Sequence, residues 1–486
     1  MKQILQSHFS GESLKAKVLR GGALLGSGST AEQLFRFGRN MVLTRLLAPQ
    51  AFGTMAVVMS TTAILESFLD VGARDALIQN PRGSEKHYVG AAWWLSVGRS
   101  SGIYFVLFLL APWVGRFYGN NELVGLMRVA SIGLLLEGVM SPRAYVSMKE
   151  MKFKKWMIVN HGGAICGVLI TLLLGFLIRD VWALAIGFVS EHAARCVLSY
   201  ALCPFTPPIR WNREAIRELL GFSKGVFGLS ILNLVFVRAD IFVLAKLYTP
   251  AQLGLYAMAV YLIQTPTGFI VNLLRQTLMP TFSHIQNDSP RINRILLQVT
   301  GVILLVGMPG LVFLFFCGHS LLTLVYGARY GAASAALIVA SCVALLNIVN
   351  NQVTTVFYAK GLPQLHRGCV LIMAILMIFM IYPFAKWFGM VGGQWACLVA
   401  IVAGCLFQID RIRRVTGVNL SPYRKSFFVS AAISLSAVAV CLMARSLGSM
   451  SRPLPTLFFG AMGCLVAYGL AFAIVSRGRI DSGLSL

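Results

Sequence analysis

Charged residues are scarce in this sequence, and acidic residues are the scarcest of them. Only 12% of its 486 residues are charged, and 17 Asp and Glu stand against 42 Lys and Arg. A soluble globular domain carries about 25% charged residues, so a soluble fold is excluded. The chain is instead 57% hydrophobic with a mean hydropathy of +0.74. Its repeated apolar runs of roughly 20 residues have the length of a helix that crosses a bilayer.

Signals for metals, nucleotides and nucleic acids are also lacking. The ten cysteines are scattered, form no CxxC pair and have no histidine at metal-binding spacing, so we expect them to pack in the core and expect no metal site. No Walker loop is present, which argues against ATP hydrolysis. The net charge of +25 would suggest nucleic acid in a soluble protein. Cytoplasmic loops of membrane proteins collect Lys and Arg, however, so we expect no nucleic-acid partner.

One stretch occurs twice. LTRLLAPQAFGTM, which begins at Leu43, recurs as LAKLYTPAQLGLY, which begins at Leu244, at a constant offset of 201 residues. The offset continues beyond the turn, where Arg74 corresponds to Arg275. Each copy ends an apolar helix with a cation, turns at Pro and Gly, and starts the next helix. We therefore predict two homologous halves that superpose on each other.

The apolar runs predict an all-α polytopic membrane protein with about 14 transmembrane helices, in two pseudo-symmetric six-helix lobes plus two C-terminal helices. One of these spans is expected near residues 122–146. The Pro-rich stretch CPFTPPIRWNR separates the lobes. The expected layout is a basic cytoplasmic leader at 1–19, an N-terminal lobe at 20–202, a cytoplasmic linker at 203–222, a C-terminal lobe at 223–410, a basic connector at 411–425, two additional helices in 426–476 and a cytoplasmic tail at 477–486.

The distribution of cations predicts the orientation. Segments expected on the side of the N-terminus carry 28 Lys and Arg, and the opposite loops carry 8. Because cytoplasmic loops hold the excess of Lys and Arg, both termini should lie in the cytoplasm.

Polar side chains recur inside the apolar helices, and several share one helical face. In the first helix, Glu32, Arg36 and Arg39 fall within about 60° of one another. A charge at the bilayer centre costs roughly 2.5–3.5 kcal/mol on insertion scales, so such residues should face a cavity or a partner. The candidate substrate-binding residues are Glu32, Arg36, Arg39, Glu66, Asp70, Arg74, Arg238, Asp240, Asn272, Arg275, Asn347, Asn351 and Thr354.

Two interpretations of these charges stay open. Three pairs stand at i,i+4 and could be ion pairs that hold helices together: Glu32–Arg36, Asp70–Arg74 and Glu191–Arg195. In the first helix, however, Arg36 and Arg39 are two cations against Glu32, and the surplus favours a cavity with water or an anion. Phosphate suits the planar guanidinium, which donates two hydrogen bonds at once. The neutral polar face of the helix around residues 347–354 suits sugar hydroxyls.

Several segments resemble a known family. LTRLLAPQAFGTMA from Leu43 and DVGARDALIQ from Asp70 are similar to the start of Wzx-type lipopolysaccharide and exopolysaccharide flippases of the multidrug/oligosaccharidyl-lipid/polysaccharide exporter superfamily. RADIFVL, GLYA, MPTFSHIQND and AKGLP in the second half resemble that family's landmarks. The order and spacing of these segments carry the resemblance, which covers nearly the whole chain. Within the family, the chain most resembles exporters of colanic-acid-type exopolysaccharide units.

The resemblance implies a flippase rather than an enzyme, built from two six-helix bundles and two extra helices. The implied substrate is a polyprenyl-diphosphate-linked oligosaccharide, moved across a bacterial inner membrane for exopolysaccharide or lipopolysaccharide synthesis. Two lobes with polar faces suit alternating access. We expect no cofactor, and a proton or sodium gradient is the candidate energy source. Candidate partners besides the bilayer are a polysaccharide polymerase and a chain-length regulator.

Two other functions are considered. A multidrug/cation antiporter of the same superfamily would share the fold but should favour a carboxylate-rich cavity, whereas here Arg36 and Arg39 lie on the first helix. A membrane polysaccharide polymerase or ligase would be an enzyme with substantial periplasmic loops. The outer loops predicted here are roughly a dozen residues or shorter, which leaves little room for such chemistry.

Overall fold

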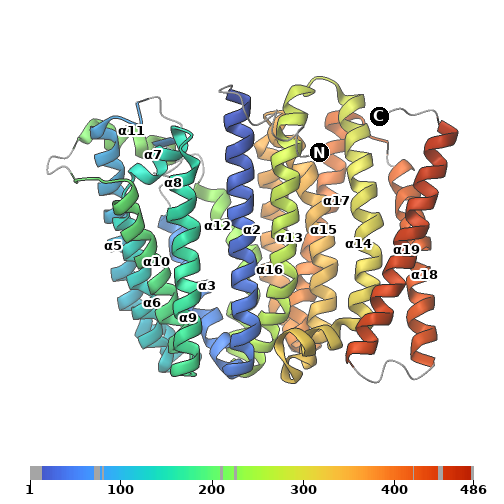
Figure 1. Cartoon of the computed structure of the whole chain (residues 1–486), viewed down its shortest axis with the longest axis horizontal. Coiled ribbons are helices and arrows are strands. Elements are labelled where there is room, and N and C mark those ends of the chain that lie inside the picture. Colours follow the sequence, from blue (N-terminus) through green and yellow to red (C-terminus); the bar gives the residue numbers. More distant parts are fainter. Residues whose placement is uncertain are drawn as a thin grey trace. The chain divides into compact units, whose positions relative to one another are not determined.

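The computed structural model of the chain describes residues 14–69, 77–78, 82–207, 212–223, 227–419, 421–446 and 453–482. These ranges contain helices and no β-strand (Figure 1). The chain divides into two compact units, unit 1 over Met1–Leu234 and unit 2 over Val235–Leu486, and the division falls inside helix α12. The all-α polytopic architecture expected from composition is confirmed.

Unit 1 is built around a bundle in which α6 packs against α5 and α10, and α10 packs against α9 (Figure 1). A short π-helix, η1, joins α8 to α9 without a break in the chain direction. The elements of unit 1 are α2 (Leu14–Leu46), α3 (Pro49–Leu69), α5 (Lys86–Tyr118), α6 (Glu122–Val139), α7 (Arg143–Lys149), α8 (Phe153–Met157), η1 (Ile158–Gly162), α9 (Gly163–Leu177), α10 (Trp182–Leu202), α11 (Arg213–Ser223) and the start of α12 (Phe227–Leu247).

In unit 2, α15 lies among α13, α14 and α17, while α16 packs against α17. The last two helices, α18 and α19, pack against each other and against α14 (Figure 1). The remaining elements are α13 (Pro250–His284), α14 (Ser289–Tyr326), η2 (Ala328–Ala333), α15 (Ser334–Ala359), α16 (Pro363–Phe388), η3 (Gly389–Val391), α17 (Gly392–Thr416), α18 (Ser421–Ser446) and α19 (Pro453–Ser482).

By length and composition, seven helical segments of the described chain could cross a membrane, or eight if the bent pair α6 and α7 is one span. One of the seven is the 54-residue stretch Pro363–Thr416. At 1.5 Å per residue it would measure about 80 Å as one helix, so it is two crossings. It folds back at Gly389, whose φ of 66° favours glycine. The total of 14 crossings stays a prediction.

The span expected near residues 122–146 is bent. α6 ends at Val139, and α7 continues at an angle of 56°. Pro142 supplies no backbone N–H and therefore breaks the ladder. Beside the break, the carbonyl of Val139 accepts hydrogen bonds from the Trp93 indole at 3.1 Å and the Tyr200 hydroxyl at 2.8 Å. The break is thus a stable part of the bundle.

Two segments expected as connections contain helix. The linker includes α11, whose apolar face buries Ala215 and Leu219 against Tyr88 of α5. The Glu218 carboxylate of α11 accepts hydrogen bonds from Arg82 and from the Tyr88 hydroxyl. The connector at 411–425 is helical over residues 411–416 and 421–425, and residues 417–419 belong to no helix. A hydropathy profile shows where a chain enters or leaves the membrane, and it does not show where a helix ends. It therefore misses helical residues outside the membrane, as in the linker and the connector.

The repeated stretch forms the same local structure twice. α2 ends at Leu46 and α12 at Leu247, and the following helices begin at Pro49 and Pro250, so both boundaries keep the offset of 201. Burial follows the same offset. The pairs Leu43/Leu244 and Val58/Ala259 are each fully buried. The repeat therefore specifies a helix–turn–helix unit with the same inward face in each half.

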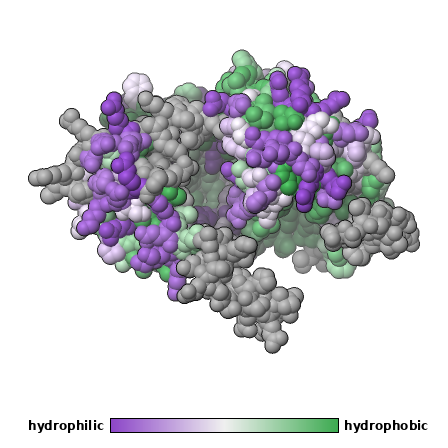
Figure 2. Space-filling model, turned by 90° about the horizontal axis from the view of Figure 1, so that it is seen from above, coloured by the Kyte–Doolittle hydropathy of each residue, from purple (hydrophilic) through white to green (hydrophobic). Residues whose placement is uncertain are grey.

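The end of each unit that faces the viewer in Figure 2 carries many hydrophilic residues. In unit 1, exposed cations at this end come from the α7–α8 region, and in unit 2 from the start of α14 and the end of α17. They are Arg143, Lys152, Lys154, Lys155, Arg291, Arg294, Arg413 and Arg414. All belong to the segments predicted to be cytoplasmic. Along the helices, by contrast, large apolar side chains such as Trp113 and Phe379 are exposed, as expected of surfaces that face lipid.

Candidate functional site

Unit 1 contains a buried charge network that joins three elements. Arg36 of α2 donates from Nε to Glu32 at 2.9 Å and from Nη2 to Glu191 of α10 at 2.6 Å. The same Glu191 oxygen accepts from Arg195 Nη2 at 2.7 Å. The second Glu32 oxygen lies 2.6 Å from Nδ1 of His161 on η1. We call Glu32, Arg36, His161, Glu191 and Arg195 the charge network of unit 1.

Close helix packing makes this network possible. On α9, an added Cβ at Gly163 would clash with Arg195, and one at Gly167 would clash with Glu191. The two glycines, four residues apart, let the backbone of α10 approach α9, as small residues do between membrane helices. Glu191 is thereby held with its side chain only 7% exposed.

The network corrects the argument that the first helix carries a surplus of cations. Two of the three i,i+4 pairs, Glu32–Arg36 and Glu191–Arg195, form as ion pairs. Glu191 adds a carboxylate that a count along the first helix omits, because it reaches Arg36 from another helix. Arg39 contacts the side-chain oxygen of Asn40 from Nε and Nη2 at 3.2 and 3.1 Å. Arg36 is therefore bound on two sides by protein carboxylates.

The polar face of the second helix is only partly described. Glu66 lies half-buried on α3. Asp70 and Arg74 fall outside the described residues, so their proposed role stays a prediction.

The two candidate cations of unit 2 have a different environment. Arg238 lies half-buried on α12, and Arg275 is exposed on α13 together with Asn272, one helical turn away. Within the described ranges, neither arginine has a carboxylate within ion-pair distance, whereas Arg36 has two. The arginines of unit 2 thus have donors available for an external anion.

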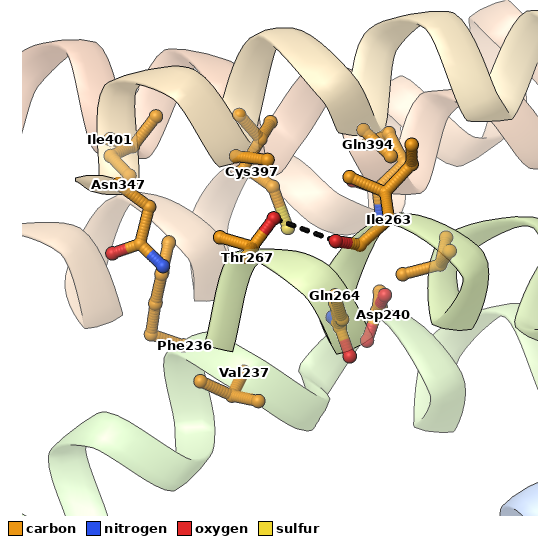
Figure 3. A pocket seen from close by; sticks show the side chains of 14 residues that line it. Phe236, Val237, Asp240, Ile263, Gln264, Thr267, Asn347, Gln394, Cys397 and Ile401 are labelled. Carbon is orange, nitrogen blue, oxygen red and sulfur yellow. Dashed lines mark hydrogen bonds between the residues drawn. The ribbon is translucent and has the colours of Figure 1, made fainter. Parts of the chain in front are cut away.

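Asp240 lies at the base of a small cavity in unit 2 (Figure 3). Its Oδ2 accepts from the Tyr256 hydroxyl at 2.6 Å, and the Gln394 amide donates to that hydroxyl at 2.7 Å. Oδ1 accepts from the backbone N–H of Ile241 at 2.8 Å. Asp240 is 4% exposed and has no ion-pair partner in the described part of unit 2.

The cavity is about 90 Å³ in volume and mixes apolar and neutral polar walls. Figure 3 shows side chains from α12, α13, α15 and α17 around it. Its polar lining residues besides Asp240 are Gln264, Thr267, Asn347 and Gln394. Pockets for drug-sized ligands measure about 300–1,000 Å³, so this one suits an ion or a few waters rather than a sugar.

The neutral polar face of α15 divides between two surroundings. Asn347 lines the cavity, and Asn351 donates to the Asn347 side chain at 2.8 Å. Thr354, only 7% exposed, accepts from Gln408 of α17 at 2.9 Å and lies 3.3 Å from His366 of α16. Thr354 thus contacts neighbouring helices, while Asn347 is the member of this face that borders open space.

Sequence reasoning does not find several members of these clusters. His161, Tyr256 and Gln394 stand alone in apolar runs, and no spacing rule connects them with an acidic residue. Glu191 stands out only through its pairing with Arg195. The one available signal is that each is a polar residue within an apolar span, which suggests a role in a cavity or a pair but does not identify the partner.

Comparisons with known proteins agree with this architecture. Residues 42–335 match the family described as "Polysaccharide biosynthesis protein", and the chain belongs to that family. The succinoglycan biosynthesis transport protein ExoT of Rhizobium meliloti (strain 1021) is 23% identical, with 84% of this chain and 81% of ExoT covered. The lipopolysaccharide biosynthesis protein WzxC of Escherichia coli (strain K12) is 22% identical, with 82% of each chain covered.

Among solved structures, the lipid II flippase MurJ in an inward closed conformation is similar, with a TM-score of 0.76. The alignment covers 94% of this chain and all of MurJ at 12% identity, which establishes a shared fold. The chain is therefore a multi-pass membrane protein of the polysaccharide biosynthesis family.

Proposed function

We propose that this protein is a flippase that moves a polyprenyl-diphosphate-linked oligosaccharide from the cytoplasmic to the periplasmic leaflet of a bacterial inner membrane, with both termini cytoplasmic. Membership of the polysaccharide biosynthesis family supports this function, as do the printed names of relatives such as ExoT, a transport protein. Alternating access of two homologous halves is the mechanism that fits the repeat. A polymerase and a chain-length regulator are proposed partners.

The observation that carries the proposal is the pair of arginines in unit 2. Arg238 and Arg275 lie in long apolar helices, and among the described residues neither has a carboxylate within ion-pair distance, although the charge of Arg238 also acts on Asp240. A guanidinium in such a place needs a counter-ion or water. A diphosphate carries several oxygens that a guanidinium can engage two at a time. Arg36 suits this role less well, since two carboxylates already bind it.

We also propose that transport is driven by a proton or sodium gradient. Asp240 supports this, because it is a buried carboxyl group beside a cavity of ion size. The alternative of a multidrug/cation antiporter rests on the same residue. The two functions differ in a direct test: an antiporter should raise the drug resistance of a sensitive strain in an Asp240-dependent manner, whereas a flippase should not.

The test of the flippase proposal is genetic complementation with chemical analysis of intermediates. Deletion of the gene in its host should abolish surface polysaccharide and leave lipid-linked repeat units on the cytoplasmic side. Arg275→Gln and Arg238→Gln should each lower export roughly 10- to 100-fold, since a hydrogen bond to a charged group contributes about 1.5–3 kcal/mol. Lys should rescue only partly, because it keeps the charge but loses the planar fork.

Arg294→Gln is the matched control, because Arg294 is an exposed arginine of the same unit at the start of α14. Protein levels must be equal in all strains. Full export by both Arg275→Gln and Arg238→Gln would overturn the assignment of these residues. Normal surface polysaccharide after deletion of the gene would overturn the function itself.

A further inference from the structure

The turn between α15 and α16 brings two aromatic rings together in unit 2. Tyr358 lies in the last turn of α15 and His366 in the first turn of α16. Gly361 makes this tight reversal possible, because its φ of 72° lies in the left-handed region that favours glycine. The ring centroids are 5.6 Å apart, and the ring planes are inclined at 56°. Both side chains are half-buried, so part of each is accessible to a ligand.

A buried chain of hydrogen bonds orients the imidazole. Gln408 of α17, which is 1% exposed, donates from Nε2 to the Thr354 hydroxyl at 2.9 Å. That hydroxyl lies 3.3 Å from Nδ1 of His366. Because the Thr354 oxygen already accepts from Gln408, we assign the hydroxyl proton to the bond with Nδ1, and the imidazole proton then belongs to Nε2. The ring thus presents a neutral N–H donor at the nitrogen that does not face Thr354.

Two cations lie near these rings. The charges of Arg275 on α13 and Arg367 on α16 both act on Tyr358, and the charge of Arg275 acts on His366 as well. Both arginines are exposed, and in the described part of unit 2 neither has a carboxylate within ion-pair distance. We call Arg275, Tyr358, His366 and Arg367 the aromatic–arginine cluster. It combines an aromatic face, a neutral donor and two guanidinium groups.

This combination of groups matches the junction between a sugar and a phosphate. A pyranose ring has a face of C–H groups, which packs on the electron-rich face of an aromatic ring, and hydroxyls at its edge, which accept hydrogen bonds. A neutral N–H suits a hydroxyl, which carries no charge. A guanidinium suits a phosphate, because its planar fork donates to two oxygens at once. The cluster therefore offers each half of a sugar phosphate the type of contact that it needs.

We propose that Tyr358 and His366 bind the first sugar of the lipid-linked oligosaccharide, the one joined to the diphosphate, while Arg275 and Arg367 bind the diphosphate. Tyr358 packs on the sugar ring, and Nε2 of His366 donates to a sugar hydroxyl. Thr354 is a positioning residue that acts through His366. This inference rests on the proposed function, which supplies the substrate class and its orientation. The cluster lies at the predicted cytoplasmic ends of α15 and α16, at the level of the lipid headgroups that the substrate would leave.

The experiment compares lipid affinities of the full-length protein in detergent. The probes are undecaprenyl diphosphate and its glucose, galactose and N-acetylglucosamine derivatives, with undecaprenol as the uncharged counterpart. Three sugars are used because a ring face and one donor recognise a pyranose without specifying which one. The wild type should bind undecaprenyl diphosphate more tightly than undecaprenol, and at least one glycolipid more tightly still. We call the ratio of the glycolipid affinity to the diphosphate affinity the sugar preference.

Removal of the two contacts should lower the sugar preference and leave diphosphate binding intact. Tyr358→Leu and His366→Leu should each lower the preference roughly 2- to 10-fold, the size expected of one aromatic contact or one neutral hydrogen bond. The double variant should bind undecaprenyl diphosphate and the glycolipids equally well. Tyr358→Phe should keep most of the preference, because it keeps the ring face.

Tyr382→Leu is the matched control for the aromatic ring. Tyr382 lies on the same helix, α16, is 51% exposed and has the Lys386 ammonium 4.8 Å from its ring centroid. It therefore represents an ordinary tyrosine near the end of a membrane helix with a cation beside it. Its loss should leave the sugar preference at the wild-type value.

A second pair of variants tests the positioning of the imidazole. Thr354→Val removes the hydroxyl that holds Nδ1 of His366, so it should lower the sugar preference without weakening diphosphate binding. Thr355→Val is its control, because the Thr355 hydroxyl is also buried but donates to the backbone carbonyl of Asn351 at 2.8 Å. A purely structural role for Thr354 would instead weaken the binding of every lipid by the same factor.

An unchanged sugar preference in the Tyr358/His366 double variant would overturn the inference. So would an equal loss of affinity for all the diphosphate lipids in that variant, or a loss of preference in Tyr382→Leu as large as in Tyr358→Leu. Equal binding of undecaprenyl diphosphate and all three glycolipids by the wild type would overturn the inference and leave the proposed function in place. A wild type that binds undecaprenyl diphosphate no better than undecaprenol would count against the proposed function itself.

Discussion

At the scale of single residues, Glu191 joins two guanidinium groups of unit 1. One of its oxygens accepts from both Arg36 and Arg195, and its side chain is 7% exposed. Helical spacing predicts the i,i+4 pairs, because residues four apart share a face. It cannot predict the bond between Glu191 and Arg36, which are 155 residues apart. That contact depends on which faces of α2 and α10 meet, and hydropathy does not specify it.

Glu191→Gln should therefore destabilise the protein strongly. The change leaves two half-buried guanidinium groups short of their shared carboxylate, and the cost of breaking a fully buried pair, about 3–5 kcal/mol, is the upper limit of the effect. Thermal unfolding in detergent measures the effect. Glu137→Gln is the control, because Glu137 is 39% exposed and lies 3.7 Å from His192. Similar melting temperatures for the two variants would mean that the network is held by other contacts.

At the scale of helices, composition and periodicity locate the spans but not the details that shape the site. α11 lies in a segment that was predicted to be a linker. Ala215 and Leu219 stand at i,i+4 and form its apolar face, but this face is too short to give the hydropathy signal of a membrane helix. The break after α6 depends on a carbonyl whose donors, Trp93 and Tyr200, come from distant segments. Local sequence can identify Pro142 as a helix breaker but not the partners that make the break stable.

The approach of α9 to α10 leads to a prediction about glycine. Gly167→Ala should destabilise unit 1 by about 1–3 kcal/mol, because the new methyl group overlaps Glu191 and forces the helices apart. Gly102→Ala on α5 is the matched control, since nothing lies within 4 Å of an added Cβ there. Alanine at that position should be neutral or stabilising by up to about 1 kcal/mol, from its higher helix propensity. Equal loss of stability in both variants would contradict close packing at Gly167.

At the scale of the whole molecule, the internal repeat is the most informative feature of the sequence. A gapless offset of 201 residues predicts two helix ends, two helix starts and the buried faces that follow them. The reason is physical, because each copy must end one helix, turn and start another helix with the same side inward. The residue types at the helix end, the turn and the next helix start are therefore restricted in the same way in both copies. Cavity-lining residues such as Gln394 carry no such constraint within the chain, and for this reason the clusters are harder to predict than the repeat.

The orientation in the membrane is a prediction for the whole chain, and it follows from the 28-to-8 distribution of Lys and Arg. Cations resist transfer across the membrane during insertion, so the ends of the units that carry them should stay in the cytoplasm. Reporter fusions measure this directly. Fusions at Gly83, Lys155 and Arg413 should report a cytoplasmic location, and fusions at Asn120, Gly327 and Met450 a periplasmic one. A uniformly reversed pattern would contradict the charge argument while leaving the helices intact. A mixed pattern would mean that at least one predicted helix does not cross, because each uncrossed helix inverts the assignment of every segment after it.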